Sequence, residues 1–258
     1  MSTSPLPASL RAALTRADAS WQAHLIAGLE AIARATPHYL DDLAADDYLP
    51  TDGRLFAAFA QPLAKVRYIL VGEGPYPRAA SATGVCFMDG AVDSLWSEAG
   101  LSKPVNRATS LRNFIKMLLV ADGQLSSGDT GAAALAPVAA RALAGAAIGT
   151  LPELQANLTA HGFLLLNASL VFRPHVAPAI DVRAWLPFLQ VILGALADAD
   201  PAPTIILWGK LAEQLGNLPE ALRLPQARAE HPYNLSFIDH TGMQILFGPL
   251  KLLARPQP

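Results

Sequence analysis

The chain has 258 residues, of which 52% are hydrophobic and 16% are charged, and its formal net charge at pH 7 is −2. This composition excludes an intrinsically disordered chain, and the small net charge excludes a general attraction to nucleic acid, so any contact with DNA must be local. The single cysteine, Cys86, excludes a disulfide framework and a four-cysteine iron–sulfur or zinc site within the chain. We expect neither a metal nor a cofactor.

The first residues, Met1 to Trp21, alternate small, polar and charged side chains, which is not the pattern of a signal peptide. No uncharged apolar run reaches the length that spans a membrane. We therefore expect a cytoplasmic protein without membrane contact. A length of 258 residues fits one large α/β domain as well as two small ones. We expect a single domain over residues 1–258.

Apolar residues at helical spacing between Ser20 and Leu43 predict an amino-terminal helical region over residues 1–48. The segment that begins at Pro50 is predicted to be a loop that enters a short helix. Asp52 is the expected cap of that helix.

A buried strand is predicted from Val66 to Val71, and it runs directly into the turn Gly72-Glu73-Gly74-Pro75. Loops at the carboxyl end of such a strand are where open α/β sheets bind their ligands. Tyr76 follows the turn, and a second short apolar run ends at Phe87, which we expect to return an aromatic face toward the same crevice. These residues predict a flat ligand between two aromatic side chains.

Residues 91–107 are predicted to form an exposed connection. A helix should follow, with Thr109 or Ser110 as its cap and a continuous apolar face. Ser110 is interpreted as an ordinary cap or as a phosphate contact, and both interpretations can hold, because the amino terminus of a helix with a free hydroxyl is itself a phosphate site. The alanine-rich residues 123–149 are predicted to be a helical insertion, broken at Pro137, without chemistry of its own.

A further helix is predicted from Leu151 to Gly162, and a second buried strand from Phe163 to Asn167. This strand places the Asn167 amide at the same crevice, although an asparagine at a strand end is more often a turn former. After a loop from Arg173 to Asp181 and a helix from Trp185 to Leu196, a third buried strand is predicted from Thr204 to Trp208. The sequence therefore predicts a three-layer α/β fold, in which helices cover both faces of a central, mostly parallel sheet of about four strands.

The residues of the first loop carry a resemblance to a known family. Gly72-Glu73-Gly74-Pro75-Tyr76-Pro77, followed by Gly84-Val85-Cys86-Phe87, is similar to the water-activating loop of uracil-DNA glycosylases, usually Gly-Gln-Asp-Pro-Tyr-His followed by Gly-Leu-Cys-Phe. The motifs are closest to those of the classical uracil-DNA glycosylases within this superfamily. The resemblance extends roughly from Leu49 to Ser236 and implies one uracil-DNA glycosylase-like domain.

Three further motifs follow in the family's order. Leu165-Leu166-Asn167 matches the run that ends in the uracil-reading asparagine, and Thr109-Ser110-Leu111-Arg112-Asn113 resembles the start of the family's Pro-Ser-Leu-Lys-Asn helix. His231-Pro232-Tyr233-Asn234-Leu235-Ser236 is similar to its His-Pro-Ser-Pro-Leu-Ser loop. By itself a His-Pro pair is weak, because a buried, hydrogen-bonded histidine is the commoner arrangement.

The resemblance implies a role for each residue of the base pocket, to which Gly72 also belongs. Phe87 would stack on the base, and Tyr76 would stand against C5, where thymine carries a methyl group and uracil does not. The Asn167 amide would present a donor to uracil O4 and an acceptor to N3–H. His231 would donate a hydrogen bond to uracil O2 as negative charge collects there.

The resemblance also implies a set of DNA contacts. Leu235 would enter the DNA stack, although exposed leucines are common, and Ser110 would contact a phosphate. Lys210 stands where the family has a small hydroxyl residue that touches a phosphate, and it would supply a charge to that phosphate or merely lie at the surface. Ser236, in the histidine loop, belongs to the same DNA-binding set.

The chain departs from the family at Gly74, because the family's catalytic aspartate falls on this position. Glu73 is the obvious substitute, although in the family this position offers mainly its backbone to the base. A glutamate followed by a small residue also resembles the Gly-Glu-Ala loop of iron–sulfur uracil glycosylases, which are active without that aspartate. This chain lacks their cysteines.

The resemblance therefore implies a monomeric DNA glycosylase of base excision repair. It would remove uracil or a related deaminated base from DNA by base flipping and hydrolysis of the N-glycosidic bond. Two alternatives stay open: a catalytically impaired DNA-binding or damage-sensing homologue, and a small-molecule enzyme on the same scaffold that acts on a free base or nucleoside.

Overall fold

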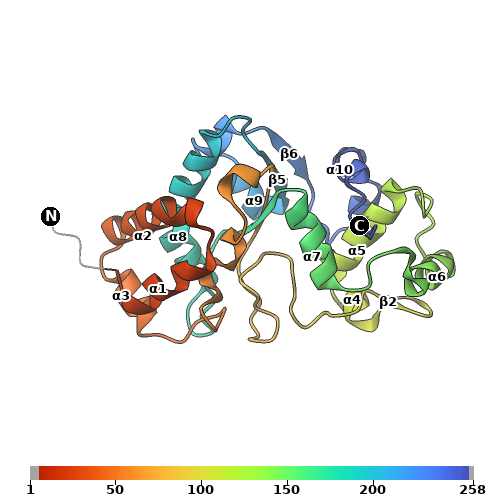
Figure 1. Cartoon of the computed structure of the whole chain (residues 1–258), viewed down its shortest axis with the longest axis horizontal. Helices are drawn as coiled ribbons and strands as arrows, with labels where there is room; N and C mark the ends of the chain where they lie inside the picture. Colours follow the sequence, from red (N-terminus) through yellow and green to blue (C-terminus); the bar gives the residue numbers. More distant parts are fainter. Residues whose placement is uncertain (1–5, 256–258) are drawn as a thin grey trace. The chain divides into compact units, whose positions relative to one another are not determined.

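The computed structural model describes residues 6–255 (Figure 1). The helices and strands of this part are α1 (Ala8–Ala13), α2 (Gln22–Ala35), α3 (Tyr39–Ala44), β1 (Tyr68–Gly72), β2 (Trp96–Ser97), β3 (Gly100–Leu101), α4 (Lys103–Arg107), α5 (Thr109–Ala121), α6 (Ala132–Arg141), α7 (Leu151–Ala160), β4 (Phe163–Asn167), α8 (Pro178–Ala197), β5 (Thr204–Trp208), α9 (Gly209–Leu215), β6 (Gln226–Ala229) and α10 (Thr241–Phe247). Short helical turns are η1 (Leu14–Arg16), η2 (Ala19–Trp21), η3 (Arg54–Phe59), η4 (Leu63–Lys65), η5 (Ala142–Ala146), η6 (Ala221–Arg223), η7 (Leu235–Asp239) and η8 (Gly248–Leu250).

The chain divides into two compact units, each of which is described by itself. Unit 1 comprises Met1–Asp89, Gly162–Leu207 and Leu211–Gln226, and unit 2 comprises Gly90–His161, Trp208–Lys210 and Ala227–Pro258.

The main sheet has four strands in the order β4-β1-β5-β6. β1 pairs in parallel with β4 and with β5, and its last residue, Gly72, lies level with Asn167 at the end of β4. The predicted α/β fold with a mostly parallel four-stranded sheet is therefore confirmed. β4 and β5 have the predicted bounds, whereas β1 begins two residues later than expected, at Tyr68.

Both faces of the sheet are buried, as the apolar character of its strands requires. On one face alternate residues of the three paired strands belong to the main core of unit 1, namely Ile69, Val71, Leu164, Leu166, Ile205 and Leu207. The residues between them, such as Leu70, Leu165 and Ile206, point to the other face and are equally buried. The edge strand β6 is half-exposed and polar, which explains why the sequence did not reveal it.

The core face of the sheet is covered by the pair α2 and α8, which run side by side in Figure 1. α8 is the one helix in the described part of the chain that is long and apolar enough to span a membrane. Its residues Trp185 and Phe188 are fully buried, and their rings meet edge to face with centroids 5.1 Å apart. This packing is typical of a core helix.

The start of α8 lies seven residues earlier than predicted, at Pro178, because proline is well tolerated in the first turn of a helix. Asp181 in this turn is buried and accepts hydrogen bonds from Arg173, at 2.6 and 3.2 Å, and from the hydroxyl of Tyr39, at 2.7 Å. This network ties α3 to α8. It anchors the predicted amino-terminal helical region, whose residues 1–5 lie outside the described residues.

The prediction that Asp52 caps the following helix is wrong. Gly53 precedes η3, and no side chain caps this turn. The Asp52 carboxylate instead accepts a hydrogen bond from Arg54, because Asp52 itself adopts a positive φ of 60° that turns it away from the helix.

Three predictions for unit 2 also need correction. Residues 91–107 are not a plain connection, since they contain the β2–β3 hairpin and α4; strands of two residues are too short to produce an alternating sequence pattern. Pro137 does not break the alanine-rich helix, because α6 continues through it on residues of the highest helix propensity. The break comes at Gly145, where φ is 95°.

α7 ends at Ala160, two residues before the predicted end at Gly162, and begins with a capping box between Thr150 and Glu153.

Candidate active site

The loop after β1 is joined to the loop after β4 by backbone hydrogen bonds in unit 1. Ala168 N donates to Gly72 O at 2.8 Å, and Ser169 N donates to Glu73 O at 3.1 Å. The parallel pairing of the two strands therefore continues past their ends. These hydrogen bonds hold the backbone of Glu73 in place and do not involve its side chain.

The third wall of this site is the segment that ends at Phe87. The Cys86 amide donates to Leu165 O at 3.1 Å, and its thiol donates to Leu70 O at 3.3 Å. Burial raises the pKa of the Cys86 thiol, so this cysteine is not a nucleophile at neutral pH. It is a packed anchor for the residue that follows it.

Gly72 lies where these three segments meet. A Cβ atom on Gly72 would lie 2.9 Å from Asn167 Oδ1 and 2.9 Å from Cys86 Cβ. Such distances essentially never occur, so only glycine lets Asn167 and Cys86 approach the turn this closely.

Asn167 is 2% exposed at the carboxyl end of β4. Buried polar side chains are nearly always hydrogen-bonded. The Asn167 amide makes no hydrogen bond to another described residue, and it is not among the side-chain groups that are fully sealed from solvent without a partner. A buried and unpaired amide at the end of a central strand is poised to bind a ligand with both a donor and an acceptor.

The two aromatic residues of the predicted pocket are half-buried. Phe87 adopts a positive φ of 67°, which is rare for a bulky side chain and is a form of backbone strain that accumulates at functional sites. Burial, followed by the nearby Asp89 carboxylate, raises the pKa of Tyr76 to about 12. Tyr76 is therefore a neutral phenol at physiological pH.

Glu73 and Gly74 line a largely apolar cavity of about 730 Å³ in unit 1, together with Ser169 and residues of α8 and α9. The Glu73 side chain is exposed. A Cβ atom on Gly74 would meet only Ser169, at 3.6 Å from its carbonyl oxygen and 3.9 Å from its Cβ, which is ordinary contact. Gly74 is also absent from the glycines with positive φ, so its backbone conformation is open to other residues.

In unit 2, the imidazole of His231 is held in one orientation. Its Nδ1 accepts a hydrogen bond from the backbone amide of Tyr233 at 3.1 Å, so the proton of a neutral ring lies on Nε2. Gly209 has a φ of 69°, and a Cβ atom there would lie 3.1 Å from His231 Cβ. The ring therefore has Nε2 as its hydrogen-bond donor, and Gly209 leaves room for the His231 side chain.

The histidine loop rests on Asn113 of α5, a residue to which the sequence analysis gave no role. Asn113 is fully buried, and its Nδ2 donates to three successive carbonyl oxygens, those of Pro232 at 2.8 Å, Tyr233 at 3.3 Å and Asn234 at 3.4 Å. One signal was available in the sequence: Asn113 is a polar residue within the apolar face of an amphipathic helix.

The predicted DNA-binding residues all lie in unit 2. Leu235 and Ser236 are exposed at the start of η7, and Lys210 is exposed on the second residue of α9. Ser110 is half-exposed in the first turn of α5, but it is not the cap of this helix. The cap position belongs to Ala108, which makes no side-chain hydrogen bond, because the preceding α4 ends directly at that residue.

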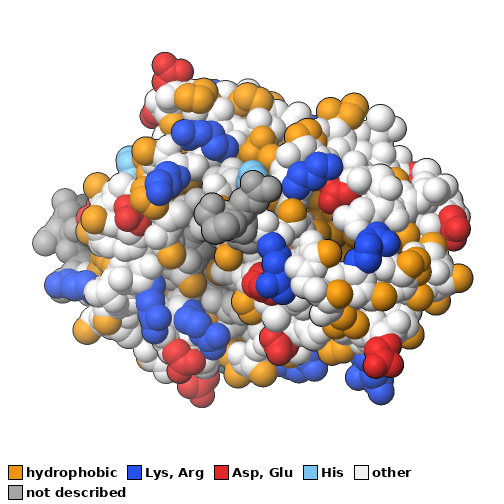
Figure 2. Space-filling model, turned by 45° about the vertical axis from the view of Figure 1, so that its right-hand side comes forward, with side chains coloured by type: hydrophobic (Ala, Val, Ile, Leu, Met, Phe, Trp, Pro, Cys, Tyr) orange, Lys and Arg blue, Asp and Glu red, His pale blue; other side chains and the backbone are white. Residues whose placement is uncertain are grey.

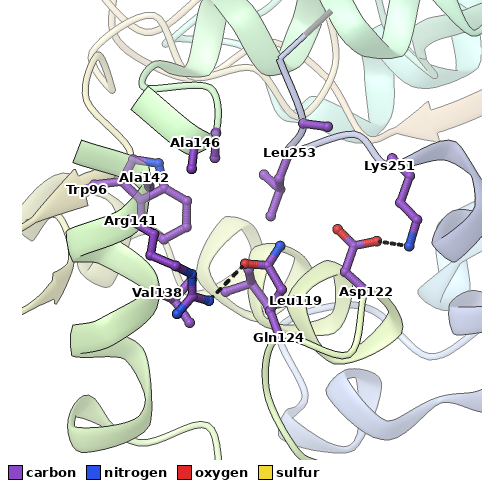
Figure 3. Close-up of a pocket in the computed structure, with 12 residues that line it drawn as sticks. Trp96, Leu119, Asp122, Gln124, Val138, Arg141, Ala142, Ala146, Lys251 and Leu253 are labelled. Atoms are coloured by element: carbon purple, nitrogen blue, oxygen red, sulfur yellow. Dashed lines mark hydrogen bonds and ion pairs between the residues drawn. The ribbon is translucent and has the colours of Figure 1, made fainter. Parts of the chain in front are cut away.

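A second cavity, of about 210 Å³, lies in unit 2 and is lined in part by Val138 and Arg141 of α6 (Figure 3). Its charged side chains already have partners: Lys251 pairs with Asp122 at 2.9 Å, and Arg141 donates to Gln124 at 3.4 Å.

On the face drawn in Figure 2, lysine and arginine side chains lie singly among acidic and apolar ones. Within residues 6–255 no group of three or more His, Cys, Asp or Glu side chains could hold a metal ion.

Comparison with known proteins shows which family the chain resembles. No protein-family model matches the chain. The chain is 31% identical over 178 residues to a uracil-DNA glycosylase of Corynebacterium glutamicum, an alignment that covers 67% of this chain and 65% of that protein. It is 28% identical over 200 residues to a uracil-DNA glycosylase of a Nocardioides species, covering 76% and 70% of the two chains. The chain thus spans slightly less than two thirds of the first of these relatives.

A solved structure matches along the whole chain. It is the wild-type UNG crystal structure from Nitratifractor salsuginis, with a TM-score of 0.88 and 38% sequence identity. The superposition covers 99% of this chain and 100% of that one.

Proposed function

Because this chain belongs to the uracil-DNA glycosylase superfamily, we propose that it removes uracil, or a related deaminated base, from DNA by hydrolysis of the N-glycosidic bond. The target nucleotide must be extruded from the strand before any side chain can reach this bond, which costs a few kcal/mol. The protein acts in base excision repair as a hydrolase that needs no cofactor.

The observation that carries this proposal is the unpaired amide of Asn167 at 2% exposure. A pyrimidine with an O4 acceptor and an N3 donor satisfies both ends of that amide at once. Cytosine presents the opposite pattern at these two positions, so it would leave the buried amide mismatched. Such a mismatch of buried polar groups is the strongest basis for rejecting a substrate.

The remaining pocket residues act on the ring and its charge. Phe87 stacks on the base, an interaction worth about 1 to 3 kcal/mol. The neutral Tyr76 stands against C5 and excludes the methyl group of thymine. His231 donates from Nε2 to uracil O2 as the base leaves with a negative charge, which is the state that a preorganised donor stabilises most.

Water activation is the step for which the chain has no carboxylate at the expected position. Glu73 lines the same cavity as Gly74, with an exposed side chain and a fixed backbone, and it is the carboxylate that we assign to this step. A positioned general base contributes about 10² to 10⁴ in rate. Without one, the pocket and His231 still stabilise the leaving base.

The DNA strand is bound by residues of unit 2. Leu235 occupies the space that the extruded nucleotide leaves in the stack. Ser110, in the first turn of the 13-residue helix α5, contacts a phosphate, as does Lys210. Ser236 belongs to the same set. These contacts are local, in accordance with the net charge of −2.

One alternative has an observation in its favour. Gly74 removes the family's catalytic carboxylate, which favours a catalytically impaired homologue that binds damaged DNA without turnover. Tight binding of abasic or uracil-containing DNA without base release selects this alternative, and indifference to DNA would instead favour an enzyme for free bases or nucleosides.

The test is single-turnover excision from single-stranded and duplex oligonucleotides that contain uracil or hypoxanthine, with wild type and Asn167→Ala. We expect the wild type to release uracil. In the variant, the excision rate should fall by a larger factor than the affinity for DNA, because phosphate contacts supply most of the binding. Unaltered uracil release by the variant would refute the assignment of the pocket.

The organisation of the protein completes the proposal. The match to a solved structure over 99% of the chain supports a single uracil-DNA glycosylase-like domain over residues 1–258, to which both units belong. We propose that the protein works as a monomer. We place it in the cytoplasm, without contact with a membrane.

A further inference from the structure

Tyr233 is the exposed member of the chain's five tyrosines, with 68% of its surface accessible, whereas the other four are buried or half-buried. It lies two residues before Leu235, which is equally exposed at 68%. Single exposed apolar residues are common and need no explanation, but two large ones on one short loop form a pair. The family loop that this segment resembles has a serine in place of Tyr233.

The exposure of Tyr233 does not come from a loose loop. Its carbonyl accepts from Asn113 at 3.3 Å, and its amide donates to Nδ1 of His231 at 3.1 Å. Asn234 N also donates to His231 O at 2.9 Å. The backbone on both sides of the side chain is therefore fixed, and the phenol ring is presented outward without a further loss of loop entropy when a ligand binds.

The surroundings of the loop fit a nucleic-acid strand. Asn113, which holds the loop, also accepts a hydrogen bond from Nε of Arg112 at 3.3 Å, so a guanidinium lies beside the loop. Lys116 lies one turn further along α5, and burial, followed by the charge of Arg112, lowers its pKa. Two close cations with incomplete solvation favour an anion next to them, and the phosphates of a strand supply it.

From this arrangement we propose that Tyr233 is a base-stacking residue that receives an unstacked base next to the extruded nucleotide and so favours single-stranded substrates. This inference rests on the proposed function and deepens it. An aromatic ring stacks on any base, and the contact matters most where the neighbouring base has no partner in a duplex. In a duplex the neighbour stays in its stack, and Leu235 is the residue that contributes.

The test measures dissociation constants by fluorescence anisotropy for oligonucleotides that contain a tetrahydrofuran abasic analogue, both single-stranded and duplex. Tyr233→Ala is expected to weaken single-strand binding by about 5- to 150-fold and duplex binding much less. Leu235→Ala is expected to show the reverse preference. Ile245→Ala removes another large exposed side chain of unit 2, at 70% exposure and outside this loop, and should leave both constants unchanged.

Two further variants and one further probe separate stacking from plain apolar contact. Tyr233→Phe should keep wild-type affinity, whereas Tyr233→Leu, which keeps apolar area without an aromatic face, should behave like Tyr233→Ala. In a single strand whose two flanking nucleotides are also abasic, wild type and Tyr233→Ala should bind equally.

The outcomes distinguish this inference from the proposed function. If the wild type releases uracil but Tyr233→Ala binds both oligonucleotides as tightly as Ile245→Ala does, the inference is refuted and the proposed function stands. The inference is refuted in the same way if the loss persists with abasic flanks, because the side chain then acts by supporting the loop. If the wild type binds neither oligonucleotide, both fail.

Discussion

Gly72 and Asn167 stand opposite each other in the parallel register of β1 and β4, and a Cβ atom on Gly72 would lie 2.9 Å from the side-chain oxygen of Asn167. The position of the Asn167 amide, to which we assign the reading of the base, thus requires the absence of a side chain on the neighbouring strand. This relationship makes the pocket sensitive to a single methyl group.

Replacing Gly72 by alanine is therefore expected to displace the Asn167 amide and to slow uracil excision by about 5- to 150-fold, the rate equivalent of a typical overpacking energy of 1–3 kcal/mol. Gly74→Ala is the matched control, because its Cβ would meet only Ser169 at 3.6 Å or more. Single-turnover excision, with thermal unfolding of each variant, checks this. Equal losses in the two variants would contradict the steric argument.

Gly74→Asp restores the carboxylate that the family has at this position. The backbone of Gly74 is not left-handed and its surroundings are open, so the substitution is expected to fold without strain. We expect a rise in the single-turnover rate of up to about two to four powers of ten. Gly74→Asn has nearly the same shape without the charge and should give no rise. A similar gain in both variants would show that shape rather than general base catalysis is responsible.

Glu73→Gln tests the carboxylate that the chain does possess. Because the Glu73 carbonyl is held by Ser169 N at 3.1 Å, the amide variant should keep the loop intact. Excision is expected to fall by about 10² to 10⁴. Glu98→Gln, at an exposed glutamate of unit 2, serves as the control and should retain the wild-type rate.

The same change has a second, conditional outcome. In the Gly74→Asp background, Glu73→Gln should be tolerated, because the introduced aspartate would take over water activation. Wild-type excision by the single Glu73→Gln variant would instead mean that Glu73 contributes only its backbone.

Asn113→Ala should separate loop support from general stability. Removing its amide leaves buried carbonyl groups such as that of Pro232 without a donor, at a cost of about 1–3 kcal/mol in the free energy of unfolding. Asn157 is a matched control, since its buried Nδ2 donates to Leu252 O at 2.7 Å and to Ala254 O at 2.9 Å, outside the histidine loop. Chemical denaturation should show similar losses for the two variants, and excision should be slowed only by Asn113→Ala. If the Asn113 and Asn157 variants slow excision equally, Asn113 contributes only to the stability of the fold.

The capping box of α7 predicts a pH dependence of stability. Hydrogen bonds from the Gly149 amide and from Thr150 hold the pKa of Glu153 below its ordinary value. A lowered carboxyl pKa means that Glu153 stabilises the fold above its unfolded pKa of about 4 and that this contribution is lost as the pH falls through the folded value. The Glu153→Gln variant should therefore have a lower melting temperature than the wild type at pH 7. This difference in melting temperature should become smaller as the pH falls below about 4. A constant difference across this range would contradict the linkage.

The strands and loops that carry the pocket could be predicted because their signals are local. The apolar runs that end at Gly72, Asn167 and Trp208 each reveal a buried strand without reference to the rest of the chain, and strand ends in a parallel sheet meet at one edge. The hairpin β2–β3 and the edge strand β6 could not be found in this way. Strands of two residues, such as β2 and β3, are too short to show an alternating pattern, and β6 is a half-exposed edge strand without a continuous apolar run.

The sequence by itself determined the fold class, the order of the motifs, and the replacement of the expected aspartate by Gly74, because these depend on residue type and on spacing along the chain. Only the tertiary structure decided that Asn167 is buried without a partner, that His231 presents Nε2, that Asn113 supports the histidine loop and that Gly74 has room for a side chain. The ring orientation of His231 depends on the conformation of its own loop, and the other three depend on atoms brought together from separate segments. Burial, hydrogen-bond partners and steric room are properties of such neighbours and leave no trace in a linear pattern.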